Sequence, residues 1–182
     1  MRVIAGEFRS RRLKSIPGNA TRPTPDRLRE TLFNILAPRL QGSTFVDAYA
    51  GTGAVGIEAL SRGASHAWFL EKNRAALLAI RENLAALKLE PRATVVGGAA
   101  LLTLGSDLAC RQAGIVFLDP PYSLEDEYTA ALHLLSETPP PLTVIQHSVR
   151  FALPEAQAGL TRIRLLKQGD NVLSFYSKTP IT

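Results

Sequence analysis

The chain has 182 residues, of which 46% are hydrophobic and 20% are charged, and its formal net charge is +5 at pH 7. This length suits one domain with a full core, and no apolar run reaches the ~18 residues of a membrane span. The start of the chain lacks the apolar core of a signal peptide. A single cysteine, Cys110, excludes an internal disulfide framework. These features predict a cytoplasmic protein with no membrane segment.

Positive charge is concentrated at the N-terminus. Residues 1–30 hold eight basic residues against three acidic ones, which equals the whole net charge of +5. Such a segment indicates a phosphate backbone as partner, and a solvated basic surface is the alternative. Val3–Ala5 and Leu13–Ile16 are predicted to pair as a β-hairpin outside the core. The predicted RNA-binding residues are Arg2, Arg9, Arg11, Arg12, Lys14, Arg22 and Arg27.

A helix follows, with Thr24 predicted as N-cap, Pro25 as first helical residue and Pro38 as its stop. Beyond it, strands and helices alternate, which predicts a parallel sheet covered by helices on both faces. The predicted strands are 45–49, 67–70, 93–96, 115–118 and 142–145, the helices between them are 54–62, 73–88, 99–110 and 125–136, and 161–166 with 172–176 form a closing hairpin.

A glycine-rich turn follows the first of these strands. The strand contains Asp47 and leads into Gly51-Thr52-Gly53, after which a helix begins. Glycine lets the backbone approach a ligand closely, and the helix start offers free N–H groups and a positive dipole end. The Gly51-x-Gly53-x-x-Gly56 spacing, with Glu71 about 20 residues after Gly51, also fits a dinucleotide fingerprint.

Asp47 favours a different cofactor from a dinucleotide. A pyrophosphate gains nothing from a carboxylate just before the turn, whereas S-adenosylmethionine carries an ammonium group and a sulfonium that a carboxylate complements. Glu71 is predicted to accept hydrogen bonds from the ribose hydroxyls. The residues predicted on the methionine side are Asp47, Ala50, Gly51, Thr52 and Gly53.

A second candidate site follows the buried strand Ile115–Leu118, where the chain reads Asp119-Pro120-Pro121-Tyr122. Two prolines make this turn rigid. The Asp119 carboxylate and the Pro120 carbonyl can accept both protons of an exocyclic amino group while Tyr122 stacks on the base. A plain proline turn with a capping aspartate is the alternative. The predicted catalytic residues are Asp119, Pro120, Pro121 and Tyr122.

Together the motifs resemble the class I S-adenosylmethionine-dependent methyltransferases, and the N-terminal block resembles the bacterial 16S ribosomal RNA guanine-N2 methyltransferase (RsmD-like) family. The matching stretches are 2–6, 11–13, 21–34, 47–54, 58–64 and 118–122, so the resemblance covers nearly the whole chain. It implies an α/β, Rossmann-like fold with a seven-stranded, mostly parallel sheet. A hairpin extension, 1–22, would precede a methyltransferase domain, 23–182. The resemblance adds Tyr49, Lys72, Ala99, Ala100 and Asp119 to the cofactor contacts.

Two stretches depart from the family pattern. Such enzymes often hold the adenine amino group with an Asp or Asn after the third strand, where this chain reads Gly97-Gly98-Ala99-Ala100. Backbone groups and apolar packing are therefore expected to hold the adenine. The fifth strand ends in Gln146-His147-Ser148, where related sequences tend to have an acid. We expect a structural role for His147.

The resemblance implies methyl transfer from S-adenosylmethionine to a guanine N2 amino group. The implied partner is 16S ribosomal RNA, free or in an assembled small-subunit particle, and the expected enzyme is a monomer without a metal. Hydrogen bonds to Asp119 and Pro120 would aim the nitrogen lone pair at the methyl group, and the base would leave its stack. The alternatives are a DNA amino-methyltransferase, a nicotinamide-dependent oxidoreductase and a catalytically silent RNA-binding module.

Overall fold

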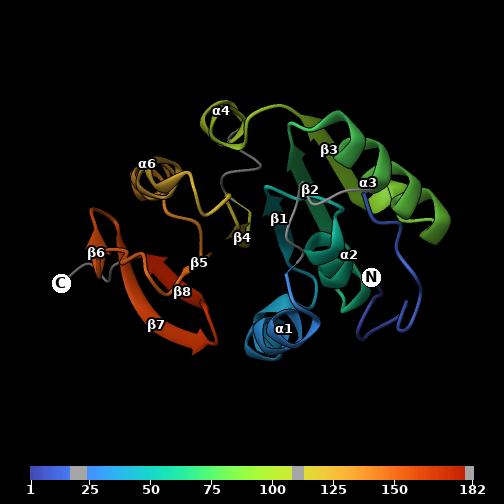
Figure 1. The fold of residues 1–182 in the computed structure, drawn as a ribbon, viewed down its shortest axis with the longest axis horizontal. Coiled ribbons are helices and arrows are strands. Elements are labelled where there is room, and N and C mark those ends of the chain that lie inside the picture. Colours follow the sequence, from blue (N-terminus) through green and yellow to red (C-terminus); the bar gives the residue numbers. More distant parts are fainter. Residues whose placement is uncertain (17–23, 108–112, 179–182) are drawn as a thin grey trace. The chain divides into compact units, whose positions relative to one another are not determined.

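A computed structural model describes residues 1–16, 24–107 and 113–178. The chain splits into two compact units, Met1–Ala100 and Leu101–Thr182. The described residues contain eight strands, three in the first unit and five in the second, together with helices in each unit (Figure 1). The α/β prediction is confirmed, and the strand count is one higher than the seven predicted.

The first unit is built on three parallel strands. Its elements are α1 (Asp26–Leu40), β1 (Thr44–Ala48), α2 (Ala54–Ser61), β2 (His66–Glu71), α3 (Arg74–Leu87), the 3-10 turn η1 (Glu90–Arg92) and β3 (Ala93–Gly97). β2 pairs with β1 on one side and β3 on the other, with Asp47 opposite Phe69 and Glu71 opposite Gly97. The carboxyl ends of parallel strands meet at one edge, so the loops after β1, β2 and β3 lie along the same edge.

Helices cover these strands because each presents an apolar stripe. α2 contacts β1 and β2, and α3 contacts β2 and β3. Asn73 caps α3 as predicted, since its side chain accepts hydrogen bonds from the amides of Ala75 and Ala76. The fully buried apolar residues of this unit include Leu32, Phe33, Phe45, Val46, Ile57, Leu60, Phe69, Leu70 and Ile80.

The ends of α1 differ from the prediction. The N-cap is Pro25 and no side chain caps the helix, so Thr24 is not its cap. Pro38 does not stop the helix, which continues to Leu40. A proline there removes only one hydrogen bond in the last turn, and Leu36 and Leu40 are both buried. The free energy gained by burying the last turn of α1 outweighs the loss of one backbone hydrogen bond.

The second unit pairs two parallel strands with an antiparallel ladder. Its elements are α4 (Ala100–Ser106, which begins at the unit boundary), β4 (Ile115–Leu118), α6 (Glu125–Glu137), β5 (Leu142–Ser148), β6 (Ala156–Gln157), β7 (Leu160–Gln168) and β8 (Asn171–Lys178). β4 and β5 are parallel, while β8 runs antiparallel to both β5 and β7. The predicted helix over 99–110 ends at Ser106 in the described residues, and 108–110 lie outside them.

Two strands of this unit differ from the prediction because of hydrogen bonding to a neighbouring strand. β5 runs three residues beyond Ile145 because Gln146–Ser148 pair with Asn171–Leu173 of β8. The two-residue β6, which was not predicted, exists through its pairing with Leu160 and Thr161 of β7. Among the described residues, no helix is long and apolar enough to cross a membrane.

Candidate active site

The chain after β1 forms a tight loop, residues 49–53, called the glycine loop below. Tyr49, Gly51 and Gly53 have backbone φ angles of 69°, 56° and 80°, and the Gly53 amide donates to the Ala50 carbonyl at 2.8 Å. Glycine adopts these angles freely, but the left-handed conformation is uncommon for a tyrosine. Backbone strain at Tyr49 is typical of a loop shaped for a ligand.

Two acids hold the glycine loop and the helix that follows it, α2, through backbone amides. Glu71, at the end of β2, accepts a hydrogen bond from the Gly51 amide through Oε2 and one from the Asn73 amide through Oε1, each at 2.8 Å. Asp47 is 2% exposed, and its Oδ2 accepts from the Gly56 amide at 2.8 Å. Carboxylate oxygens have further lone pairs, so the predicted ligand contacts of both acids remain compatible with these structural ones.

The three glycines of the motif serve different purposes. A Cβ on Gly56 would lie 2.4 Å from the Phe69 ring, so this glycine lets α2 pack closely on β2. A Cβ on Gly53 would meet Phe69 and Ile80 at 3.3 Å. A Cβ on Gly51 would have no heavy atom within 4 Å. The open side of the loop is therefore at Gly51, which is where a ligand can approach the backbone.

Asn83 of α3 holds the glycine loop from behind, a role that the sequence did not reveal. Its side-chain amide donates to the carbonyls of Thr52 and Lys14, and its Oδ1 accepts from the Lys14 amide at 2.7 Å. The Thr52 hydroxyl donates to the sulfur of Met1 at 3.5 Å. The sequence contained one indication that Asn83 is buried and hydrogen-bonded, because it is a polar residue on the helix face that contains the buried Ile80 and Leu87.

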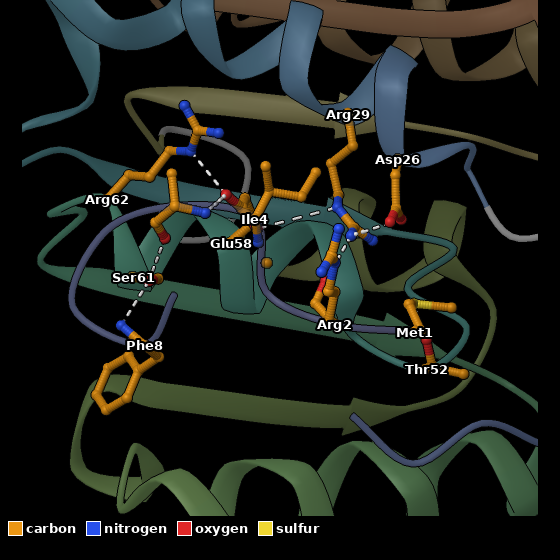
Figure 2. Close-up of polar contacts among 12 residues, drawn as sticks. Met1, Arg2, Ile4, Phe8, Asp26, Arg29, Thr52, Glu58, Ser61 and Arg62 are labelled. Carbon is orange, nitrogen blue, oxygen red and sulfur yellow. Dashed lines mark hydrogen bonds and ion pairs between the residues drawn. The ribbon is translucent and has the colours of Figure 1, made fainter. Parts of the chain in front are cut away.

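Residues 1–16, called the N-terminal segment below, pack against α2 within the first unit (Figure 2). The segment makes a tight reversal in which Arg2 bridges to Arg12, rather than the strand pairing predicted. Val3 and Leu13 are buried. The expectation that this hairpin lies outside the core was wrong. Its apolar side chains Val3 and Leu13 are buried, and its backbone amides form hydrogen bonds with side chains of α2.

Glu58 of α2 supplies those partners. It is fully buried, and its carboxylate accepts from the amides of Ile4 and Ala5 at 2.8 and 3.0 Å and from Arg62 Nε at 2.7 Å. Ser61 adds hydrogen bonds to the Ala5 carbonyl and the Phe8 amide (Figure 2). A buried carboxylate is stable only when it is paired and hydrogen-bonded, so Glu58 joins the N-terminal segment to the helix that follows the glycine loop.

The remaining predicted cofactor residues lie near the ends of β2 and β3. Lys72 and Ala99 are exposed, and Ala100 is the buried first residue of α4. The Gly98 amide donates to the Glu71 carbonyl at 3.0 Å, which keeps the end of β3 beside Glu71. Within the first unit, the structure thus brings together Gly51, Glu71 and Gly98.

The Asp-Pro-Pro-Tyr turn, Asp119–Tyr122, follows β4 in the second unit. The buried Tyr128 of α6 donates its hydroxyl to the Pro120 carbonyl at 2.9 Å. The Tyr122 hydroxyl donates to Asn171 Oδ1 at 2.6 Å. Burial raises the pKa of Tyr128, and the negative charge of Asp119 adds to the shift, so Tyr128 remains a hydroxyl donor. Sequence reasoning missed Tyr128 and Asn171, which no motif marks.

His147 lies in β5 with both ring nitrogens engaged. Nδ1 lies 3.0 Å from the Ser148 carbonyl, and Nε2 lies 2.9 Å from the Ser174 hydroxyl. A carbonyl can only accept, so Nδ1 carries the proton and Nε2 accepts from Ser174. Burial lowers the pKa of His147, although the Ser148 carbonyl opposes the shift. These are the contacts of a neutral core histidine, as expected from the sequence.

The predicted RNA-binding residues do not share one environment. Lys14 is ion-paired with Glu82 at 3.2 Å. Arg2, Arg9 and Arg27 line a hollow between the N-terminal segment and α1. Arg11 and Arg12 are exposed outside that hollow, and Arg22 lies outside the described residues. No cluster of three or more metal-binding side chains is found in ranges 1–16, 24–107 and 113–178.

Comparison with known proteins identifies the family. A family model described as Conserved hypothetical protein 95 matches residues 1–177. Ribosomal RNA small subunit methyltransferase D of Escherichia coli (strain K12) is 43% identical over 122 residues, which are 67% of this chain and 60% of that protein. The chain belongs to the RsmD family of rRNA methyltransferases. The resemblance noted from the N-terminal block and the two motifs is therefore confirmed.

Other relatives are similar to this chain over nearly the full length of both proteins. The YlbH protein of Bacillus subtilis (strain 168) is 36% identical over 184 residues, covering 98% of this chain and 99% of YlbH. The solved structure of Escherichia coli yhhF has a TM-score of 0.84 at 33% identity and covers 98% of this chain and 97% of its own. An RNA methyltransferase from Salinibacter ruber in complex with S-adenosyl-L-homocysteine has a TM-score of 0.65 at 14% identity, covering 88% and 97% of the two chains. That distant likeness concerns the fold alone, and the predicted class I methyltransferase fold is confirmed.

Proposed function

We propose that this protein transfers a methyl group from S-adenosylmethionine to the N2 amino group of a guanine in 16S ribosomal RNA. The observation that carries the proposal is the match of the RsmD family over residues 1–177, with a relative named as a small-subunit rRNA methyltransferase. The Asp-Pro-Pro-Tyr turn supports it chemically, because its acceptors suit an amino group on a planar base. The same substrate supports the prediction of a cytoplasmic protein.

The residues of the glycine loop fit S-adenosylmethionine. Gly51 has open space where a side chain would stand, and the acids Asp47 and Glu71 lie next to the loop. Asp47 would balance the cofactor's positive charge, and Glu71 would accept from its ribose hydroxyls. Tyr49, Ala50, Thr52, Gly53, Lys72, Ala99 and Ala100 complete the proposed cofactor contacts. When bound, the cofactor supplies a methyl group on a sulfonium, which needs only a well-aligned nucleophile.

The Asp-Pro-Pro-Tyr turn would orient that nucleophile. The lone pair of a guanine N2 amino group is delocalised into the ring, so the nitrogen attacks poorly unless its N–H groups are held. The Asp119 carboxylate and the Pro120 carbonyl would accept one N–H each, while Tyr122 stacks on the flipped base. The Pro120 carbonyl already accepts from Tyr128, which leaves one lone pair for the substrate. Asp119 or water would take the proton released after transfer.

Methyl transfer from tritium-labelled S-adenosylmethionine tests this function. The acceptors are naked 16S RNA, assembled small-subunit particles and DNA, with the Asp119→Ala variant as control. We expect label in RNA or particles, recovered as N2-methylguanine, and none with the variant. Label in DNA alone would support a DNA amino-methyltransferase instead. No transfer to any acceptor, with intact cofactor binding, would leave an RNA-binding module as the better account.

A further inference from the structure

A hollow of about 320 Å³ lies between the N-terminal segment and the start of α1. Three arginine side chains line it, two from the segment and one from the helix. The complete lining is Arg2, Val3, Ile4, Arg9, Ser10, Asp26, Arg27 and Glu30. The volume is at the lower end of the range for ligand pockets and accommodates a group the size of one nucleotide.

Within the part of the chain that the structure describes, the three arginines are not neutralised by ion pairs. Three other basic residues of the first unit do form ion pairs, Lys14 with Glu82, Arg62 with Glu58 and Arg92 with Glu7. No ion pair to the side chains of Arg2, Arg9 or Arg27 is found among the described residues, and all three are exposed. Unpaired guanidinium groups around one hollow create a positive potential that attracts anions.

A fourth arginine contacts two residues of the lining and offsets the negative charge of one of them. Arg29 is fully buried, and its Nη2 donates to the Arg2 carbonyl at 2.7 Å and to Asp26 Oδ1 at 3.0 Å (Figure 2). The positive charge of Arg29 therefore compensates the negative charge of Asp26. Glu30 is the one acid of the lining for which no ion pair is found among the described residues. Arg29 also fixes the backbone at Arg2, one of the residues that line the hollow.

We propose that this hollow binds a backbone phosphate of the RNA substrate, with Arg2, Arg9 and Arg27 as its ligands. The proposal rests on the proposed function for the identity of the RNA. Guanidinium groups bind phosphate oxygens bidentately, which gives position as well as affinity. Among the predicted RNA contacts, these three arginines define a site, whereas Lys14 is already ion-paired and Arg11 and Arg12 lie outside the hollow. Phosphate contacts of this kind set the register of the substrate without reading its sequence.

The test is the salt dependence of RNA binding, measured without methyl donor on a 16S RNA fragment. The Arg2→Gln, Arg9→Gln and Arg27→Gln triple variant should bind more weakly at low salt. Because the three arginines are proposed to hold one phosphate, the triple variant should lose one phosphate contact, and its log–log salt slope should flatten by roughly 0.7–0.9. The substitutions keep the backbone groups that hold Arg29, and urea unfolding checks that the fold is intact.

A charge-matched triple variant, Arg39→Gln, Arg81→Gln and Lys88→Gln, is the control. These exposed residues lie in or just after α1 and α3, outside the hollow. We expect a much smaller change in slope for it. Equal slopes for the two triple variants, or an unchanged slope for the first, would overturn the proposal. Because methyl donor is absent, this result is independent of whether the wild-type protein transfers a methyl group to RNA.

Discussion

The glycine loop and the Asp-Pro-Pro-Tyr turn are both short segments after a parallel strand, but different groups hold them. Carboxylates hold the glycine loop and the start of α2, because Glu71 accepts from the Gly51 amide and Asp47 accepts from the Gly56 amide. Hydroxyl groups stabilise the turn, because Tyr128 donates to the Pro120 carbonyl. The first arrangement leaves negative charge beside the loop, where a cationic cofactor gains from it. In the second, we propose that the Asp119 carboxylate accepts from a substrate amino group.

The difference predicts that the two segments fail in different ways. Changes in the glycine loop should weaken cofactor binding, whereas changes at the turn should slow the chemical step. Asp119→Ala should give the largest effect, a loss on the order of 10²-fold or more in kcat, because it would remove the acceptor that we propose aligns the reacting nitrogen. Single-turnover methylation and calorimetry with S-adenosylmethionine measure the two quantities. Equal losses in turnover and cofactor affinity would make Asp119 a cofactor ligand instead.

Gly51→Val should lower the affinity for S-adenosylmethionine tenfold or more, because the new side chain would occupy the open side of the glycine loop. Gly53→Val is a poorer test, since its Cβ would press on Phe69 and Ile80 and so disturb the packing as well. Gly42→Val is the matched control. Its φ of 71° is as strained for valine as the 56° of Gly51, and its Cβ also meets nothing within 4 Å.

Both valine variants should therefore lose similar stability, about 1–2 kcal/mol from the left-handed conformation. Only Gly51→Val should weaken cofactor binding by calorimetry. An equal loss of affinity in the Gly42 variant, or normal binding by the Gly51 variant, would move the cofactor site away from the glycine loop.

Tyr128→Phe should lower kcat about 3- to 10-fold, since the Pro120 carbonyl would lose a hydrogen bond of about 0.5–1.5 kcal/mol. Cofactor affinity should not change. Tyr176→Phe is a close control, because the hydroxyl of the buried Tyr176 donates to another proline carbonyl, that of Pro154, at 2.7 Å. Similar destabilisation in both variants but slower turnover only in the first is the expected result. Equal turnover in the two would show that Tyr128 merely supports the fold.

The smallest expected effect is an acid sensitivity from His147. Burial holds its pKa below the ordinary 6.5 in the folded state, so the unfolded chain binds more protons once the pH falls below about 6.5. Stability should therefore decrease as the pH falls through that value. His66 shares the direction of shift, so urea unfolding at pH 7 and pH 5 should compare wild type with His147→Gln. An identical pH dependence in the variant would contradict this assignment.

Local sequence signals predicted the two segments well. Glycine and proline fix the backbone at the residues where they occur, so β4, the glycine loop and the start of α2 were placed correctly. Asn73 was identified as a cap because its partners are two and three residues away.

The sequence did not reveal the groups that hold these segments, because their partners are far apart along the chain. Glu58 binds Ile4 across 54 residues, and Asn83 binds Lys14 across 69. Both are polar residues within apolar helix faces, which gives a hint of burial but not of a partner. The N-terminal segment was consequently taken for an appendage. Deleting it would remove the partners of a buried carboxylate, so point substitutions at its exposed arginines are the sounder test of RNA binding.

Mass mapping of 16S ribosomal RNA from a strain that lacks this protein tests the central claim most directly. We predict that one guanine loses its N2 methyl group, and that the wild-type protein restores the modification while the Asp119→Ala variant does not. A 16S ribosomal RNA whose methylated guanines are the same with and without the protein would contradict the account.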